Sequence, residues 1–335
     1  MTKLAEPRWP DAAVFAEENI PDEARALNRR IVEAISSVPN RWSIPMPVVR
    51  TARASGRGVF PLCAPDPHAE TFIVTGPDGN DIPLRVLRPT TREARGTYLH
   101  IHGGGWVMGS PSENDERMRR IAENVGLVTV SVDYRLAPEH PYPAAPDDCE
   151  AAALWLLSDT QHDLPRQFLA IGGESAGGHL TAVTLLRLRD RHGVWPFHAA
   201  NLVAGCYDLG GTPSVRNWGP EPLVLATEDV KRCTGLFVPE GRDRRAADIS
   251  PLYATLEHMP PALFTCGTQD LLIDDTMMMA HRWHAAGNGV ELGIYPGGCH
   301  VFQSFPSAQG DESLAQMDAF LNRMADAVTS GREAP

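Results

Sequence analysis

From about residue 97 onward, short apolar segments alternate with longer segments in which apolar residues recur at helical spacing. The apolar segments lie at residues 98–101, 128–132, 168–171, 202–204, 262–266 and 290–295, and the helical patterns at 113–124, 144–158, 177–191, 276–287 and 308–328. Apolar strands that alternate with helices are typical of a parallel sheet covered by helices on both faces. The pattern therefore predicts an α/β fold.

The N-terminal region and one internal stretch depart from this alternation. Residues 20–32 carry an amphipathic helical pattern, and residues 71–74 and 82–87 flank an Asp-Gly turn, which predicts a β-hairpin. The stretch from about 209 to 248 is first rich in Gly and Pro and then helical. We expect it to form an insertion at the carboxyl edge of the sheet, where ligands bind in open α/β folds.

Composition and charge narrow the classes of function. The 335 residues are 43% hydrophobic and 21% charged, which is typical of a globular protein with a large core. The net charge of −12 argues against binding to nucleic acid or to anionic membranes, which attract clustered cations. No signal-peptide pattern, no membrane-spanning apolar run and no paired cysteine motif is present. We expect a cytoplasmic protein with reduced thiols, either monomeric or a homo-oligomer.

The motif Gly173–Gly177, of the form G-x-S-x-G, lies between a predicted strand and a predicted helix. Its glycines permit a tight, strained turn that holds the hydroxyl of Ser175 clear of the sheet, at the positive end of the helix. The motif alone occurs often by chance, and a serine here could simply cap the helix. Because the strand–turn–helix context fits a nucleophile, we expect Ser175 to have this role.

A second glycine-rich motif, His102–Gly105, follows another predicted strand upstream of the serine. Glycine leaves backbone amides unshielded, so that they can turn toward the oxyanion that develops in acyl transfer. An ordinary loop or a phosphate-binding loop could have this composition, but no G-x-x-x-x-G-K-[ST] pattern is present. The two motifs in this order, each after a strand, indicate acyl transfer.

A nucleophilic serine requires a base and an acid that orients the base, in the chain order Ser, Asp or Glu, His for this kind of turn. His300 follows the last predicted strand, whereas His179 lies in the helix after the serine and cannot return to it. Asp270 comes just after the preceding strand; Asp208 is the alternative acid, and Asp274 is interpreted as a helix cap. We expect Asp270 and His300 to act with the serine, without a metal or organic cofactor.

Five motifs in order resemble the hormone-sensitive-lipase-like family of bacterial esterases: His102–Gly105, Tyr134–Glu139, Gly173–Gly178, Gly267–Asp270 and His300. The resemblance implies an α/β-hydrolase fold with a mostly parallel sheet, and ester hydrolysis by Ser175, Asp270 and His300. It also implies an oxyanion hole made by the amides of Gly103, Gly104 and Ala176. The family usually has Asp before the serine, where this chain has Glu174, and this difference concerns a supporting hydrogen bond.

The resemblance further implies a helical cap over the site. We expect residues 1–50 and 209–248 to form the cap, and residues 51–208 and 249–335 to form the catalytic domain. An amphipathic helix must bury its apolar side, and the insertion leaves the sheet at the edge where the serine emerges. Since a cap should leave only a limited apolar pocket, we expect small carboxylic esters with short or medium acyl chains as substrates.

Several other functions share part of this sequence pattern. Amides, lactones and carbamates share the oxyanion and the triad, so the sequence does not separate them from esters. A non-catalytic ligand receptor would be expected to lack part of the triad, and a nucleotide-binding redox enzyme would carry G-x-G-x-x-G.

The Pro-rich segment 134–143 contains two charged residues, Arg135 and Glu139, which we interpret as residues that lock loops together.

Overall fold

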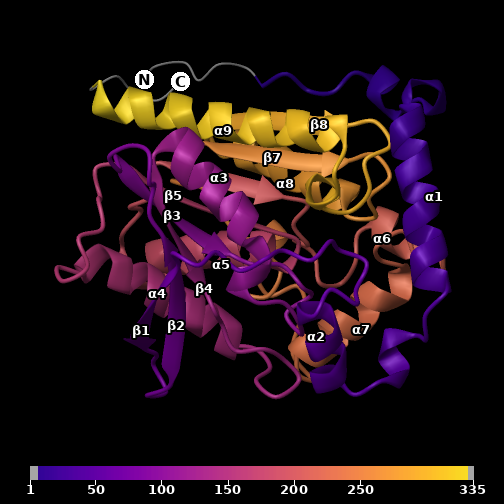
Figure 1. Ribbon diagram of the computed structural model, residues 1–335, viewed down its shortest axis with the longest axis horizontal. Coiled ribbons are helices and arrows are strands. Elements are labelled where there is room, and N and C mark those ends of the chain that lie inside the picture. Colours follow the sequence, from indigo (N-terminus) through magenta and orange to yellow (C-terminus); the bar gives the residue numbers. More distant parts are fainter. Residues whose placement is uncertain (1–6, 331–335) are drawn as a thin grey trace.

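The computed structural model describes residues 7–330, and its centre is an eight-stranded sheet in the order β1-β2-β4-β3-β5-β6-β7-β8 (Figure 1). β2 is antiparallel to both of its neighbours, and the strands from β4 to β8 in this order are parallel. The strands are β1 Glu70–Thr75, β2 Asp81–Leu87, β3 Gly96–Ile101, β4 Leu127–Val132, β5 Leu169–Glu174, β6 Ala199–Val203, β7 Ala262–Gly267 and β8 Val290–Tyr295. Strands β3 to β7 are buried along their whole length, as expected for a sheet that is covered on both faces.

Helices cover both faces of this sheet (Figure 1). α3 (Asp115–Val125) and α9 (Ala308–Thr329) pack together on one face. The other face is covered by α4 Ala144–Ser158, α5 Ala176–His192 and α8 Ile273–Ala285. Trp283 of α8 and Phe320 of α9 are almost completely buried, so each layer contributes large side chains to its own side of the core.

The element order predicted from the hydrophobic pattern is confirmed, including the β1–β2 hairpin. Some helix and strand boundaries in the structure differ from the predicted ones, at places where the local sequence pattern is weak. β6 begins at Ala199, three residues before the predicted apolar run, because its first residues are small or polar. α8 begins at Ile273, where the backbone turns into the helix directly after the Asp270 loop.

The N-terminal segment contains two helices, α1 (Asp22–Ser36) and α2 (Met46–Ala54). The pattern at residues 20–32 predicts α1, but α2 was not predicted. None of its residues is fully buried, and its first turn holds Pro47 and two β-branched valines, which favour a helix only weakly. Short 3₁₀ helices occur at Ala12–Phe15, Glu17–Asn19, Arg41–Ser43, Pro111–Asn114, Pro251–Tyr253 and Phe302–Ser304.

The insertion between β6 and β7 contains α6 (Pro213–Asn217) and α7 (Thr227–Phe237). The N-terminal segment contacts it directly, because the indole Nε1 of Trp42 donates to Asp229 Oδ1 of α7 at 2.7 Å. In Figure 1 the arrowheads of β7 and β8 point toward α1. Both segments thus lie beyond the carboxyl ends of the parallel strands, the edge at which open α/β sheets bind ligands.

No helix within residues 7–330 combines the length and the apolar character needed to cross a bilayer. All six cysteines are free thiols in the structure, and five of them are buried. Burial raises the pKa of Cys233 and of Cys299 to about 12, so both thiols stay protonated near neutral pH.

Candidate active site

Ser175 occupies the turn between β5 and α5 and has a left-handed backbone, with φ of 57° and ψ of −121°. A non-glycine residue in such a sparsely populated conformation costs on the order of 1–3 kcal/mol and persists only where its surroundings enforce it. Gly173 and Gly177 allow this close packing, since a Cβ there would lie 2.2 and 1.9 Å from the Ile101 carbonyl oxygen. The Ser175 amide donates to the Val203 carbonyl at 2.8 Å. The turn therefore holds the serine side chain at the carboxyl edge of the sheet.

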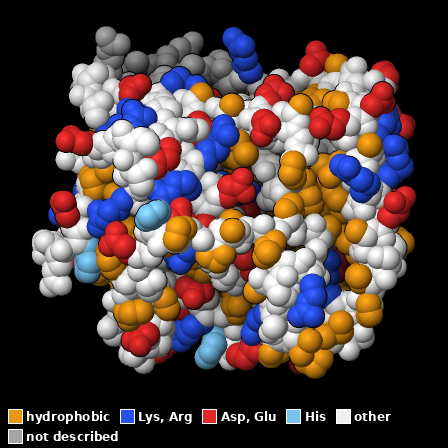
Figure 2. All heavy atoms as spheres, in the orientation of Figure 1, with side chains coloured by type: hydrophobic (Ala, Val, Ile, Leu, Met, Phe, Trp, Pro, Cys, Tyr) orange, Lys and Arg blue, Asp and Glu red, His pale blue; other side chains and the backbone are white. Residues whose placement is uncertain are grey.

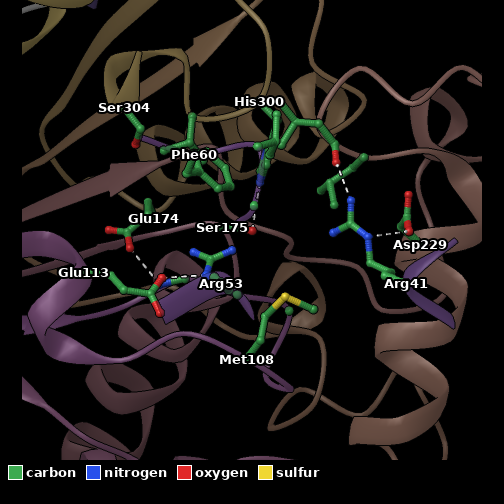
Figure 3. Close-up of a pocket in the computed structure, with 18 of the residues that line it drawn as sticks. Arg41, Arg53, Phe60, Met108, Glu113, Glu174, Ser175, Asp229, His300 and Ser304 are labelled. Atoms are coloured by element: carbon green, nitrogen blue, oxygen red, sulfur yellow. Dashed lines mark hydrogen bonds and ion pairs between the residues drawn. The ribbon is translucent and has the colours of Figure 1, made fainter. Parts of the chain in front are cut away.

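The structure brings together the three residues proposed from the sequence. Ser175 Oγ lies 2.9 Å from His300 Nε2 (Figure 3), and His300 Nδ1 lies 2.9 Å from Asp270 Oδ2. A carboxylate only accepts hydrogen bonds, so Nδ1 carries the imidazole proton and Nε2 is left to accept from the serine hydroxyl. Asp270 and His300 are buried, whereas Ser175 is partly exposed. A substrate can therefore reach the hydroxyl, while its two partners are shielded from water.

The loops that carry Asp270 and His300 are joined directly to one another. A Cβ on Gly267 would lie 1.9 Å from the Gly298 carbonyl oxygen, so only glycine allows the two loops to pass at this distance. The Gln269 amide donates to the same Gly298 carbonyl at 3.0 Å, and the Gly297 amide donates to Thr268 Oγ1 at 2.8 Å. These contacts fix the carboxylate and the imidazole relative to one another before any substrate binds.

Helix α1 supports the same loop from the outside. Asn28 Nδ2 donates to the Gly297 carbonyl at 2.9 Å, and Leu27 joins a buried apolar cluster with Cys299 and Phe302. The side of α1 that carries Leu27 and Asn28 thus packs against residues before and after His300. Cys299 is completely buried in this cluster and contributes to packing there.

The glycine-rich loop after β3 lies beside the serine, and its amides differ in what they contact. The Gly103 amide donates to Glu174 Oε1 at 2.6 Å, so it is not free to meet a substrate as the resemblance implies. No acceptor within the described chain bonds the amides of Gly104 and Ala176. Gly104 has φ of 124°, and a Cβ there would lie 2.0 Å from the Met108 carbonyl oxygen, so this loop conformation requires glycine.

The side chain of His102 fixes the start of the glycine-rich loop. Its Nδ1 donates to the Gly103 carbonyl at 2.8 Å, while its own carbonyl accepts from the Tyr134 hydroxyl at 2.8 Å. The two rings stack with centroids 4.2 Å apart. Burial lowers the pKa of His102 to about 4, so the imidazole is neutral and acts as a structural donor.

His179 takes no part in the Ser175–His300 contact, as its place in α5 predicts. Its Nδ1 accepts from Trp106 Nε1 at 3.1 Å, and its Nε2 donates to the Ile249 carbonyl at 2.8 Å. Burial lowers the pKa of His179 to about 4 as well. The residue therefore ties the glycine-rich loop to the segment that returns from the insertion.

Glu174, directly before the serine, lies in a buried ionic network. Its Oε2 accepts from His100 Nε2 at 3.1 Å and from Arg117 Nη1 at 3.2 Å. Burial alone would raise the pKa of Glu174, but the hydrogen bond from His100, the guanidinium of Arg117 and the Gly103 amide lower it to about 2. Sequence reasoning missed Arg117, because an arginine in a charged helical segment gives no signal that separates it from a solvated surface residue.

The other acidic residues considered as triad members lie elsewhere. Asp208 accepts from the Tyr253 hydroxyl at 2.9 Å and from the Gly210 amide at 2.8 Å. Asp274 accepts from the Ser214 amide at 2.8 Å and thereby joins α8 to the insertion. Within residues 7–330, no group of three or more His, Cys, Asp or Glu residues is arranged to hold a metal ion.

The two charged residues of the segment 134–143 form cross-links, as interpreted from the sequence. Arg135 Nη2 donates to the buried Asp148 at 2.8 Å. Glu139 accepts from Arg50 of α2 at 2.7 Å, and Arg50 Nε also donates to the Val107 carbonyl at 2.7 Å. Helix α2 is therefore fastened to the glycine-rich loop and to the Pro-rich segment together.

A cavity of about 1150 Å³ opens onto Ser175. Figure 2 shows the surface hollowed near the centre of this face, with hydrophobic side chains along one side of the hollow. Ion pairs Arg53–Glu113 and Arg41–Asp229 lie on opposite sides of Ser175 (Figure 3). The residues that precede β1 and the insertion contribute most of the apolar lining, which includes Val38, Trp42, Val49, Phe60, Val224 and Val230.

Comparison with known proteins agrees with this fold. Residues 98–304 match the profile of an α/β-hydrolase fold family. The carboxylesterase NlhH of Mycobacterium tuberculosis is 33% identical over 276 residues, which cover 77% of this chain and 83% of that protein. A hyperthermophilic esterase from the archaeon Pyrobaculum calidifontis superimposes with a TM-score of 0.80 at 30% identity, covering 90% of this chain and 98% of that one. A hormone-sensitive lipase from a metagenome library gives a TM-score of 0.77 at 27% identity, with 91% and 99% covered.

The fold and these similarities define an α/β-hydrolase. The chain belongs to the hormone-sensitive-lipase-like esterases of this family, and it is a carboxylic ester hydrolase. The resemblance found in the sequence motifs is confirmed.

The two buried histidines make stability depend on pH. The pKa of His179 falls from its ordinary value of 6.5 to about 4 on folding, which corresponds to roughly 3 kcal/mol. The unfolded chain binds the proton first as the pH falls below 6.5, so this stability is complete above pH 6.5 and is lost toward pH 4. We expect the free energy of unfolding in urea to decrease less between pH 6.5 and pH 4 in His179→Gln than in the wild type. Parallel pH curves for the two proteins would contradict the assignment.

Proposed function

We propose that this chain is a serine carboxylesterase that works through an acyl-enzyme intermediate. The hydrogen-bonded series Ser175–His300–Asp270 carries the proposal, because it joins a partly exposed hydroxyl to a shielded base and acid. The strained turn at Ser175 adds support, since strain of this kind is stored where function requires it.

In the proposed first step, Ser175 Oγ attacks the ester carbonyl carbon while His300 Nε2 takes the hydroxyl proton. Asp270 keeps the imidazole in the correct tautomer and stabilises its positive charge. His300 then donates that proton to the leaving alcohol as the carbon–oxygen bond breaks and the acyl-enzyme forms. In the second step His300 deprotonates water, which attacks the acyl carbon, and the proton returns to Ser175 as the acid leaves.

The oxyanion of each tetrahedral intermediate requires donors that are already in place. We propose the amides of Gly104 and Ala176 for this role. The Ala176 amide lies at the positive end of α5, and neither amide has another acceptor within residues 7–330. Gly103, expected as a third donor, supports the loop through its contact with Glu174 instead.

We propose small carboxylic esters with short or medium acyl chains as substrates. The cavity is closed behind the glycine-rich loop. A Cβ on Gly105 would lie 2.6 Å from the Cys233 sulfur, and the rings of Trp106 and Phe237 stack with centroids 4.9 Å apart. We also propose that residues 1–50 and 209–248 act as a cap that limits the length of the substrate; residues 1–6 of this expected cap lie outside the described residues. The contact between Trp42 and Asp229 supports this arrangement.

Ser175→Ala tests the nucleophile. We expect kcat for p-nitrophenyl butyrate to fall on the order of 10⁶-fold, as for other triad serines, with an unchanged melting temperature. Mass spectrometry should find a fluorophosphonate probe on Ser175 in the wild type and no label in the variant. Turnover close to that of the wild type in the folded variant would exclude the mechanism.

Asp270→Asn tests the acid against two isosteric controls. An asparagine amide facing His300 Nδ1 would favour the wrong imidazole tautomer, so we expect kcat to fall roughly 10⁴-fold, as in a well-studied serine protease. Asp208→Asn and Asp274→Asn should each cost far less, since neither side chain contacts His300. A greater loss in Asp208→Asn than in Asp270→Asn would show that the acid is misassigned.

Val230→Phe tests the role of the insertion in acyl length. Val230 lines the cavity from α7, so a larger side chain there should shorten the space for an acyl chain. We expect the ratio of kcat/KM for butyrate over laurate esters to rise about tenfold, an effect of roughly 1.4 kcal/mol. Lys231→Phe, one position along on the exposed side of α7, is the matched control. An unchanged ratio in Val230→Phe would show that this wall does not limit the acyl chain.

A further inference from the structure

Arg117 of α3 connects the two loops that carry Ser175 and His300. Its Nη1 donates to Glu174 Oε2 at 3.2 Å, and its Nη2 donates to Ser304 Oγ at 3.1 Å. Its side chain is 11% exposed and lines the cavity. We infer that Arg117 is a positioning residue that holds the base loop against the nucleophile turn, an inference that rests on the proposed function.

At its first contact, the guanidinium acts on a carboxylate next to the nucleophile. Glu174 is the residue before Ser175, and its other oxygen accepts from the Gly103 amide at 2.6 Å. The carboxylate is only 8% exposed, and a buried charge of this kind requires a counter-charge. One guanidinium hydrogen bond therefore supports both the strained serine turn and the glycine-rich loop.

At its second contact, the guanidinium holds the segment that follows His300. Val301 has a left-handed backbone with φ of 51°, and the Ser304 amide donates to its carbonyl at 2.9 Å. A hydrogen bond to Ser304 Oγ is thus relayed through one tight turn to the residue beside His300. Figure 3 shows Glu174 and Ser304 on the same side of the Ser175–His300 pair.

The geometry of arginine suits this connection. A planar guanidinium presents separate donors at a fixed angle, so one side chain can hold two acceptors at a defined distance, whereas a lysine offers a single point charge. The connection acts in parallel with the Ser175–His300 hydrogen bond, which must loosen and re-form as the proton moves. A second tie that does not change during the reaction keeps Nε2 within reach of the hydroxyl.

Arg117→Ala in the full-length protein tests the inference. We expect kcat for p-nitrophenyl butyrate to fall about 10- to 100-fold, the cost of a small misplacement, while KM changes less than about threefold. About 50 mM guanidinium chloride, far below the molar range that unfolds proteins, should restore kcat at least fivefold by refilling the vacated site from the cavity. Methylammonium chloride at the same concentration should restore little.

Arg119→Ala is the matched control, since Arg119 lies on the same helix but bonds Asp66 at 2.8 Å and the Arg88 carbonyl at 2.6 Å rather than either loop. It should keep the kcat of the wild type and show no response to guanidinium. Ser304→Ala removes only the second contact, so we expect a several-fold loss in kcat without rescue. Arg117→Lys should keep the charge beside Glu174 but lose the bridge, and its kcat should lie between those of Arg117→Ala and the wild type.

Two results would overturn the inference: an unchanged kcat in Arg117→Ala, or a lowered kcat that guanidinium does not restore in a variant that melts like the wild type. If Arg117→Ala does not fold, Ser304→Ala decides, and an unchanged kcat there would also overturn it. The rate at which a fluorophosphonate labels Ser175 separates this inference from the proposed function. A wild type that is labelled but cleaves no ester counts against the proposed function, while slower labelling in Arg117→Ala still supports positioning.

Discussion

The whole site depends on the strained backbone at Ser175. A serine with φ of 57° between a parallel strand and a helix is stable only where the strand, its neighbours and the helix pack too closely to allow an alternative. Gly173 and Gly177 provide this closeness, because any side chain there would collide with the Ile101 carbonyl of β3. The close packing of the central sheet therefore does two things: it stabilises the fold, and it holds a reactive hydroxyl in an exposed and fixed place.

The remaining groups reach this hydroxyl from separate parts of the chain, and each is fastened to a neighbour. The loops that carry the acid and the base approach each other closely at Gly267 and Gly298, and the Gln269 amide bonds the Gly298 carbonyl, so Asp270 and His300 are held together. The glycine-rich loop is held through the Gly103 amide by Glu174, next to the serine. Preorganisation of this kind removes the reorganisation that an oxyanion or imidazolium would otherwise require in water.

Sequence patterns predicted much of this because the decisive signals are local. Apolar strand segments and the glycine motifs reflect short-range backbone requirements, so the sheet, the turn at Ser175 and the residues proposed around it could be read from nearby residues. Contacts between distant segments leave no such pattern. Arg117 looks like any arginine of a charged helix, and the engagement of the Gly103 amide by Glu174 depends on a tertiary contact between β3 and β5. Helix α2 has no fully buried residue, and the bonds from Arg50 to the Val107 carbonyl and from Arg53 to Glu113 fasten it to distant segments.

The N-terminal segment shows why substrate selection and catalysis are difficult to separate in this protein. Its first helix, α1, packs on the loop of His300 through Leu27 and Asn28, while the following residues reach α7 through Trp42. Helix α2 then returns to the glycine-rich loop through Arg50. One continuous segment therefore lines the cavity and also supports both the base and the oxyanion loop. Removing it would disturb the geometry of the reaction together with the shape of the pocket, so substitutions on α7 report on acyl length more cleanly than truncation does.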